Sequence, residues 1–439
     1  MDFPDDYLAL LEGETRVPST LVAVLDPDAG PLAPEEVVGR LSGLEGVRFE
    51  TGDLEREPGE PDAWRFWLIA RSEDDDGDPC AYLIYQEPND DSEQLHQEWR
   101  WLAPGEVERG KQSRRRIGVV SYVDEDPLGD FHRQIEILSC LVDDAVYVMD
   151  MEACRPFSGL WLREAASVPV PPPPESLYSV HQVVAEDETC WFHTHGLKRC
   201  GLPELEILNV EPGGYQIALS LINVTAKLIL DRGMPAANEP FLVGYDMELL
   251  WLPWKIALEA EEMIGDELGG PEDRNEFHDQ PSAVLYAPGE DPGDLLNPGA
   301  VFTAIQHPVF FISSMETQRM RYLALFRLEY FAAVFHQRGR HEDWSFVMKI
   351  GYAIDGATDD DDYEHLWFRV HDMGPDWMSG ELLNQPYQIE RLKQGEVLRN
   401  DLTQMSDWQI RSPHGHFDAD NVRLLFEHEA NLAPPQAIQ

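Results

Sequence analysis

The chain has 439 residues, of which 82 are acidic and 33 are basic, so its formal net charge at pH 7 is −49. This charge argues against direct binding to nucleic acid, because the phosphate backbone would be repelled unless a local basic patch overcame the field. The hydrophobic fraction of 43% is sufficient for buried cores. The length predicts several domains, at roughly 100 to 200 residues each.

No stretch of the sequence predicts a membrane span. The longest apolar run, from Phe241 to Trp254, is interrupted by Asp246, Glu248 and Pro253, and it is well short of the roughly 20 residues that a span requires. The first residues are acidic, whereas a secretory signal begins with basic residues. We therefore expect a cytoplasmic protein without membrane contact.

Its five cysteines include no Cys-x-x-Cys pair, which predicts reduced thiols.

The N-terminal region, residues 1–167, is expected to be an α+β region with a subdivision near residue 105. Its predicted elements are, in chain order, a strand at 20–25, a helix at 34–44, strands at 64–70, 81–86 and 117–123, a helix at 131–141 and a strand at 145–149. Pro34 fits the first turn of a helix. The helix at 131–141 repeats apolar residues every three or four positions, which is typical of a helix with one buried face.

The proline-rich residues 168–176 predict an extended segment, which we interpret as a linker to a middle α+β domain at 177–343. The elements predicted for that domain are strands at 177–184 and 189–194, a helix at 215–230, a strand at 283–286 and a helix at 314–337. Ser313 with Glu316 forms the sequence pattern of a capping box for the last helix, and Gly339 is placed to end it.

A C-terminal α+β domain is predicted at residues 344–430, with strands at 345–353 and 365–370 and a frayed tail at 431–439. Trp367 and Trp408 are expected to anchor its core. The predicted fold class is therefore α+β and multidomain, with small mixed sheets packed with helices and a barrel-like C-terminal module.

The densest group of residues able to do chemistry lies at 191–207. His193 and His195 alternate as they would on a strand, so both rings project from one face, and Glu204 and Glu206 repeat the pattern after a turn. A metal site needs three or four nitrogen, oxygen or sulfur ligands in one place. These four residues could provide them, and they are the predicted ligands of a divalent metal.

An ordinary structural role for the same segment stays open, because Arg199 could pair with Glu204 or Glu206. Cys200 is expected to be a small buried thiol rather than an activated nucleophile. The sequence contains neither a Gly-x-Ser-x-Gly elbow nor a phosphate-binding loop with its lysine. It therefore predicts no catalytic residue and no organic cofactor site.

Four blocks near the C-terminus follow one another in order: Glu364-His-Leu-Trp-Phe-Arg-Val370, Gly380-Glu-Leu-Leu-Asn-Gln-Pro386, Leu392-Lys-Gln-Gly395 and Met405-Ser-Asp-Trp408. This region resembles the bacterial domain of unknown function 2314. The preceding chain, including Asp130-Phe-His-Arg133 and Ser158-Gly-Leu-Trp-Leu162, resembles domain of unknown function 4026. The resemblance implies a bacterial origin and this domain order, and it carries over no catalytic residue.

The charge and the lack of a catalytic signature favour a non-catalytic protein that binds another macromolecule, such as an immunity or antagonist protein that covers a basic partner. The alternative is a metal-dependent enzyme or ligand-binding protein that uses His193, His195, Glu204 and Glu206. The acidity also fits a role in solubility or a salty cytoplasm.

Overall fold

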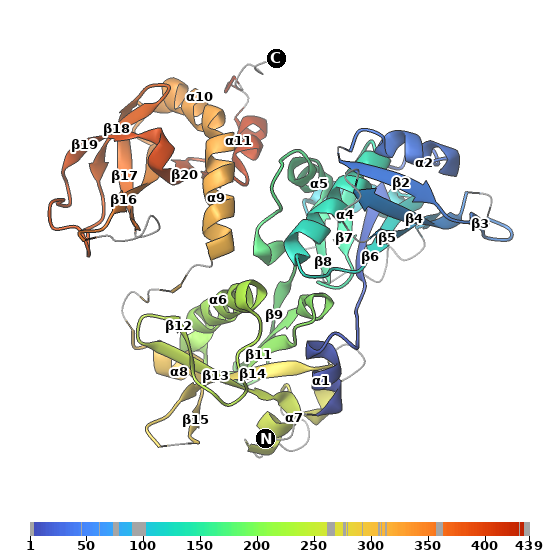
Figure 1. Cartoon of the computed structure of the whole chain (residues 1–439), viewed down its shortest axis with the longest axis horizontal. Helices are drawn as coiled ribbons and strands as arrows, with labels where there is room; N and C mark the ends of the chain where they lie inside the picture. Colours follow the sequence, from blue (N-terminus) through green and yellow to red (C-terminus); the bar gives the residue numbers. More distant parts are fainter. Residues whose placement is uncertain are drawn as a thin grey trace. The chain divides into compact units, whose positions relative to one another are not determined.

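The structure is a computed structural model. It describes residues 4–44, 46–60, 62–72, 79–89, 102–260, 268–274, 278, 280–291, 293–305, 308, 310–311, 314–356, 363–429 and 431–433. The chain forms two compact units, Met1–Ser313 and Ser314–Gln439. Among the described residues, the chain contains eleven α-helices and three β-sheets, which confirms the multidomain α+β class (Figure 1).

The first sheet organises the N-terminal part of the first unit. Its strands are, in spatial order, β2 (Val47–Thr51), β4 (Trp64–Ser72), β5 (Cys80–Pro88), β6 (Arg115–Ser121), β1 (Ser19–Leu25), β7 (Ala145–Asp150) and β8 (Arg155–Ser158), and β3 (Glu55–Arg56) pairs with β4. Because β5 pairs with β6, the sheet runs across the subdivision expected near residue 105. The structure places no domain boundary there.

Helices cover both faces of this sheet, which explains why β1 is apolar almost throughout. Leu21 and Ala23 share a core with α2 (Pro34–Leu41), α4 (Pro127–Leu141) and α5 (Gly159–Ala166). Val22 and Val24 point to the other face, because side chains alternate along a strand, and they pack near α3 (Pro104–Gln112) through Val107.

The second sheet belongs to the same unit and is mixed. Its strands are β12 (Phe241–Gly244), β13 (Met247–Pro253), β14 (Ser282–Pro288), β11 (Glu204–Val210), β10 (Cys190–His195) and β9 (Ser179–Val184), and β15 (Leu295–Leu296) pairs with β14. Strands β11 and β14 run parallel, whereas β9, β10 and β11 are antiparallel neighbours. Helices α1 (Asp5–Leu11), α6 (Tyr215–Arg232), α7 (Trp254–Ala260) and α8 (Pro298–Phe302) complete this part.

Helix α6 carries much of the second core. Its residues Leu221, Ile222 and Ala226 are completely buried beside the sheet. The segment Pro212–Arg232 is also apolar and long enough to cross a membrane by length and composition alone. Half of its apolar window is buried inside the unit, as expected for the core helix of a folded domain.

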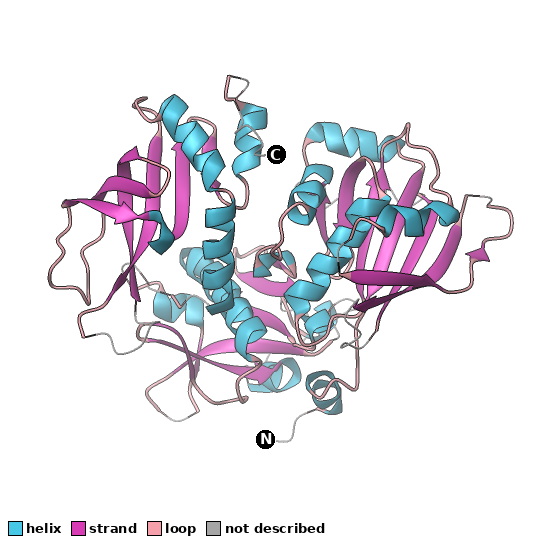
Figure 2. Ribbon diagram, turned by 45° about the horizontal axis from the view of Figure 1, so that its top comes forward, coloured by secondary structure: helices cyan, strands magenta, loops and turns pink. Residues whose placement is uncertain are grey.

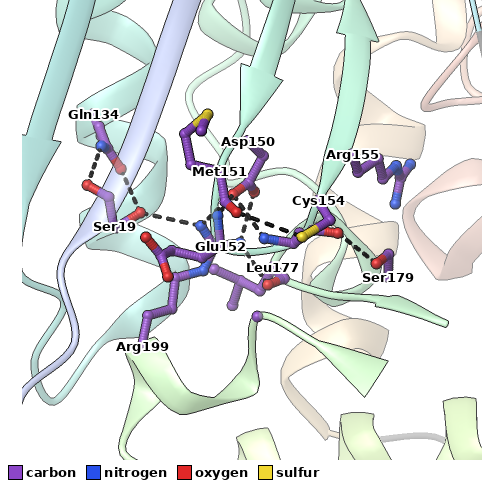
Figure 3. A network of polar contacts seen from close by, with 12 residues as sticks. Ser19, Gln134, Asp150, Met151, Glu152, Cys154, Arg155, Leu177, Ser179 and Arg199 are labelled. Atoms are coloured by element: carbon purple, nitrogen blue, oxygen red, sulfur yellow. Dashed lines mark hydrogen bonds and ion pairs between the residues drawn. The ribbon is translucent and has the colours of Figure 1, made fainter. Parts of the chain in front are cut away.

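A buried ion pair joins the two sheets (Figure 3). Arg199 lies in the 3-10 helix η3 (Leu197–Cys200) just after β10, and it contacts both carboxylate oxygens of Asp150 at the end of β7, at 2.9 and 2.7 Å. Both side chains have no exposed surface. The guanidinium also donates to Ser19 Oγ of β1 and to the carbonyl of Leu177.

The proline-rich residues 168–176 do connect the two sheets, as expected, but they do not separate two compact units. Pro172 and Pro174 are buried, and residues 174–176 form the 3-10 helix η2 (Pro174–Ser176). The Arg155 side chain donates to the carbonyl of Glu175 at 2.9 Å. This packing and the Arg199–Asp150 pair hold the expected N-terminal and middle regions in one unit.

The second unit is a six-stranded antiparallel sheet with helices. Its strands are β19 (Val397–Asp401), β18 (Trp377–Leu382), β17 (Tyr363–Met373), β16 (Ser345–Ala353), β20 (Met405–Ser412) and β21 (Gly415–Asp418), and its helices are α9 (Ser314–Phe326), α10 (Leu328–Arg338) and α11 (Val422–His428). The ribbon view shows helices lying across one face of this sheet (Figure 2). The sheet is open in the described residues, so the expected barrel-like module is not a closed barrel.

The boundary between the units precedes α9, whereas the sequence placed it at residue 344. Trp408 of β20 donates from Nε1 to the carbonyl of Ala324 in α9 at 2.9 Å, and Arg319 of α9 forms an ion pair with Asp420. These contacts attach α9 to the C-terminal sheet and to the segment that follows β21. Ser313 of the expected capping box and the tail at 434–439 lie outside the described residues.

The single helix predicted at 314–337 is in fact two helices. The break is at Arg327, whose backbone leaves the helical region at φ −101° and ψ 14°. Its guanidinium donates to the carbonyls of Ala419 and Asp420. This contact to a distant segment could not be read from the local helical pattern.

Replacing Arg199 by methionine should destabilise the chain strongly, because the Asp150 carboxylate would stay buried without its partner. The expected loss in the free energy of unfolding is about 3 to 5 kcal/mol, measured by urea denaturation. The control is Arg65→Met, which removes a pair with Glu55 whose side chains are both 64% exposed. That control should change stability by less than about 1 kcal/mol. Equal effects of the two substitutions would contradict the assigned role of Arg199.

A buried carboxyl in the second unit should make stability depend on pH. Asp407 faces Lys349 across β20 and β16, and burial raises its pKa to about 7. Because this pKa is higher in the folded state than the usual 3.8, the stabilising contribution is complete below about pH 4 and is lost as pH rises to about 7.

We therefore expect Asp407→Asn to flatten the decrease in stability of the full chain between about pH 4 and pH 7. Urea denaturation across this pH range measures the effect. The exposed Asp376, changed to Asn, serves as the control and should leave the slope unchanged. A wild-type slope that persists in Asp407→Asn would show that another group titrates.

Candidate metal centre

Three histidines gather on one face of the second sheet because of strand register. His193 of β10 lies opposite His181 of β9 and opposite Glu206 of β11. Directly opposed residues in antiparallel strands share a face, with Cβ atoms about 4.5 to 5.5 Å apart. His195 follows His193 by two residues and so points to the same face. The register thus places His181 beside the pair that the sequence identified.

The three imidazoles lie close enough to share an ion. One ligand nitrogen from each of His181, His193 and His195 lies within 4.8 Å of the other two. Their ring centroids are 4.7 to 5.7 Å apart. His193 Nδ1 is buried and has no hydrogen-bond partner in the structure. Because buried polar atoms almost always have partners, this free nitrogen is evidence for a bound group.

A fourth imidazole reaches the same place from a different segment. His278 follows the 3-10 helix η5 (Pro271–Asp273), and its ring centroid lies 4.9 Å from that of His193 and 5.3 Å from that of His195. Its Nδ1 is also buried without a partner. We call His181, His193, His195 and His278 the histidine cluster.

Three of these imidazoles, those of His193, His195 and His278, are neutral near pH 7. Burial lowers the pKa of His193 and His278 below the usual value and lowers that of His195 to about 3. The neighbouring imidazoles lower the pKa of His193 and His195 further, because two cations would repel each other in a buried site. Neutral imidazole is the form that binds a metal, so these rings need not lose a proton first.

Glu206 is held by other groups. Arg274 contacts both of its carboxylate oxygens, at 2.5 and 2.8 Å, and the Arg274 and Glu206 side chains are 2% and 3% exposed. Trp191 Nε1 donates to the same carboxylate at 2.9 Å, and Ser282 Oγ donates to it as well. This carboxylate therefore neutralises a buried arginine beside the cluster.

Glu204 organises the turn after β10. Its carboxylate accepts hydrogen bonds from the backbone N–H groups of Gly196, Leu197 and Lys198 and from Thr194 Oγ1. These bonds satisfy donors at the start of η3, which would otherwise be buried without partners. The turn also needs Gly196, whose φ of 115° is rare for other residues.

The expected four-ligand set is thus revised. His193 and His195 are brought together as predicted, whereas Glu204 and Glu206 are not part of the group of converging ligand atoms. Arg199 pairs with Asp150 rather than with either glutamate, the alternative that the sequence left open. His181 and His278 were missed. Strand register, which places His181 opposite His193, cannot be read from the sequence, and nor can the approach of His278 to His193 and His195.

Cys200 does not contribute a reactive thiolate here. Burial raises its pKa to about 12, and the nearby Arg199 only partly opposes this effect. The five cysteines are all free, in agreement with the expected reduced thiols.

Comparison with known families covers most of the chain. Residues 19–172 and 180–286 match the N-terminal and C-terminal parts of DUF4026, described as a protein of unknown function. Residues 327–428 match DUF2314, described as an uncharacterized protein conserved in bacteria. No curated protein and no solved structure matches the chain. The histidine cluster lies on residues that match the C-terminal part of DUF4026, apart from the DUF2314 match.

Replacing Glu204 by glutamine should lower stability without lowering the amount of metal bound per chain. The amide would present N–H groups to backbone donors, and loss of a hydrogen bond to a charged group costs about 1.5 to 3 kcal/mol. Thermal or urea unfolding measures the first effect, and elemental analysis of the zinc-loaded chain measures the second. Loss of metal with unchanged stability would instead make Glu204 a ligand.

Proposed function

We propose that the DUF4026 part of the chain, which belongs to that family and is followed by a DUF2314 domain, binds one divalent transition-metal ion. The proposed ligands are His181, His193 and His195. The observation that carries the proposal is the convergence of three imidazoles, two of them buried and one half-buried, whose ligand nitrogens lie within 4.8 Å of one another.

The chemistry of the ligands favours zinc or a similar ion. Imidazole nitrogen suits Zn²⁺, Cu²⁺, Fe²⁺ and Ni²⁺, whereas Ca²⁺ and Mg²⁺ require oxygen ligands. Zinc binds histidine nitrogen at about 2.0 to 2.1 Å. Nitrogens within 4.8 Å of one another need only small side-chain rotations to reach a common ion at that distance.

The surroundings of the cluster support a binding site more than a chance grouping. Two of the ligands are fixed on β10, which is paired on both sides, with β9 and β11. A hydrogen bond holds the Trp191 and Glu206 side chains in place beside the cluster. The Arg274 guanidinium lies 5.2 Å from the Trp191 ring centre. Ligands held by a rigid scaffold lose little conformational entropy when the ion binds.

The expectation that the acidic chain binds a basic partner remains a separate prediction, and its support is the net charge of −49.

The purified full chain, stripped with a chelator, should bind one Zn²⁺ per chain in isothermal titration calorimetry. His181→Asn and His193→Asn should each weaken binding at least about tenfold, since loss of even an outer-shell partner of a ligand costs 10- to 100-fold. His181 is only half-buried, so its variant should fold even if the His193 variant does not.

His371→Asn is the matched control, because His371 is an exposed histidine of β17 in the second unit. Its affinity for zinc should equal that of the wild type. Absence of saturable binding by the wild-type chain, or an equal loss of affinity in the control, would refute the proposed site.

A further inference from the structure

The spacing of four imidazoles can be compared with that of a tetrahedral centre. With Zn–N bonds of about 2.05 Å, the centre of each ring lies about 3.2 Å from the ion, and four such centres lie about 5.2 Å from one another. The five centroid separations recorded within the histidine cluster are 4.7, 4.9, 5.0, 5.3 and 5.7 Å. They lie on both sides of the tetrahedral value, and two of them involve His278. The ligand atoms that already converge within 4.8 Å are those of His181, His193 and His195, so the His278 side chain must rotate toward the ion to bind it.

The hydrogen bonding of His278 is that of a metal ligand. Its ring makes a hydrogen bond to the backbone of Asp273, while its Nδ1 is buried and has no partner. Histidines that bind metals commonly donate one ring N–H to a backbone carbonyl or carboxylate, which orients the other nitrogen toward the ion. His193 also has a buried, unpartnered Nδ1.

Residues 269–274, which precede His278 in the chain, are anchored beside the cluster. Arg274 bridges from this segment to Glu206 of β11 and also donates to the carbonyl of Gly269 at 2.8 Å. Gly269 N–H in turn donates to Asp273 at 2.8 Å. These contacts keep η5 near the sheet. They also give Glu206 a role as a positioning residue, which holds Arg274 and η5 beside the sheet.

Building on the function proposed above, we propose that His278 is the fourth ligand and that the four histidines form a closed tetrahedral centre. The ion then has four protein ligands and no position for water. Zinc sites that activate water keep such a position, whereas structural sites are closed. The centre therefore ties His278 to β9 and β10 in the loaded chain, and it has no free position at which a water could attack a substrate.

The test uses the full chain loaded with Co²⁺, whose visible absorption reports its coordination, together with Zn²⁺ titration. We expect the intense visible bands of four-coordinate cobalt in the wild type. His278→Ala should weaken zinc binding at least about tenfold and alter the cobalt bands. Added imidazole should fill the vacated position and restore them, which a merely structural role of His278 would not produce.

Gln280→Ala is the matched control, because Gln280 follows His278 by two residues and bonds Lys198. It should leave affinity and spectrum unchanged. Wild-type affinity and bands in His278→Ala, with binding still lost in His181→Asn, would overturn this inference alone and indicate an open three-histidine centre. Absence of metal from the wild type would overturn the proposed function as well.

Discussion

The first unit depends on the buried ion pair between Arg199 and Asp150. The pair joins the end of β7 in the first sheet to the turn after β10 in the second. Separating two buried charges is costly, so the pair fixes where β10 ends. His195 lies four residues before Arg199, and the geometry of the histidine cluster is therefore tied to the packing of both sheets.

Around the cluster, the glutamates and the histidines have different roles. Glu204 satisfies the backbone of a turn and Glu206 neutralises Arg274. Both carboxylates are used in full, which leaves the imidazoles of His193 and His195 without an anionic partner. Their burial then keeps them neutral, as ligands must be. The two histidines and the two glutamates form similar alternating pairs in the sequence. Their contacts in the fold give them different roles.

Local patterns predicted much of the fold, and long-range pairing accounts for the rest. Apolar periodicity located most of α4, and alternation placed His193 and His195 on one face. Sequence reasoning could not know that β9 pairs with β10 so that His181 lies opposite His193. Nor could it know that Arg327 contacts Ala419 and ends α9. Each missed feature depends on a contact between segments that are distant in the chain.

The proposed all-imidazole centre would influence the oxidation state of a bound ion. Neutral ligands cancel none of the charge of the ion, and the carboxylate of Glu206 nearby is already occupied by Arg274. In a buried site each additional unit of charge costs more than in water. The cluster would therefore raise the reduction potential of iron or copper and favour the lower-charged form. Zinc, which has no redox chemistry, would be unaffected.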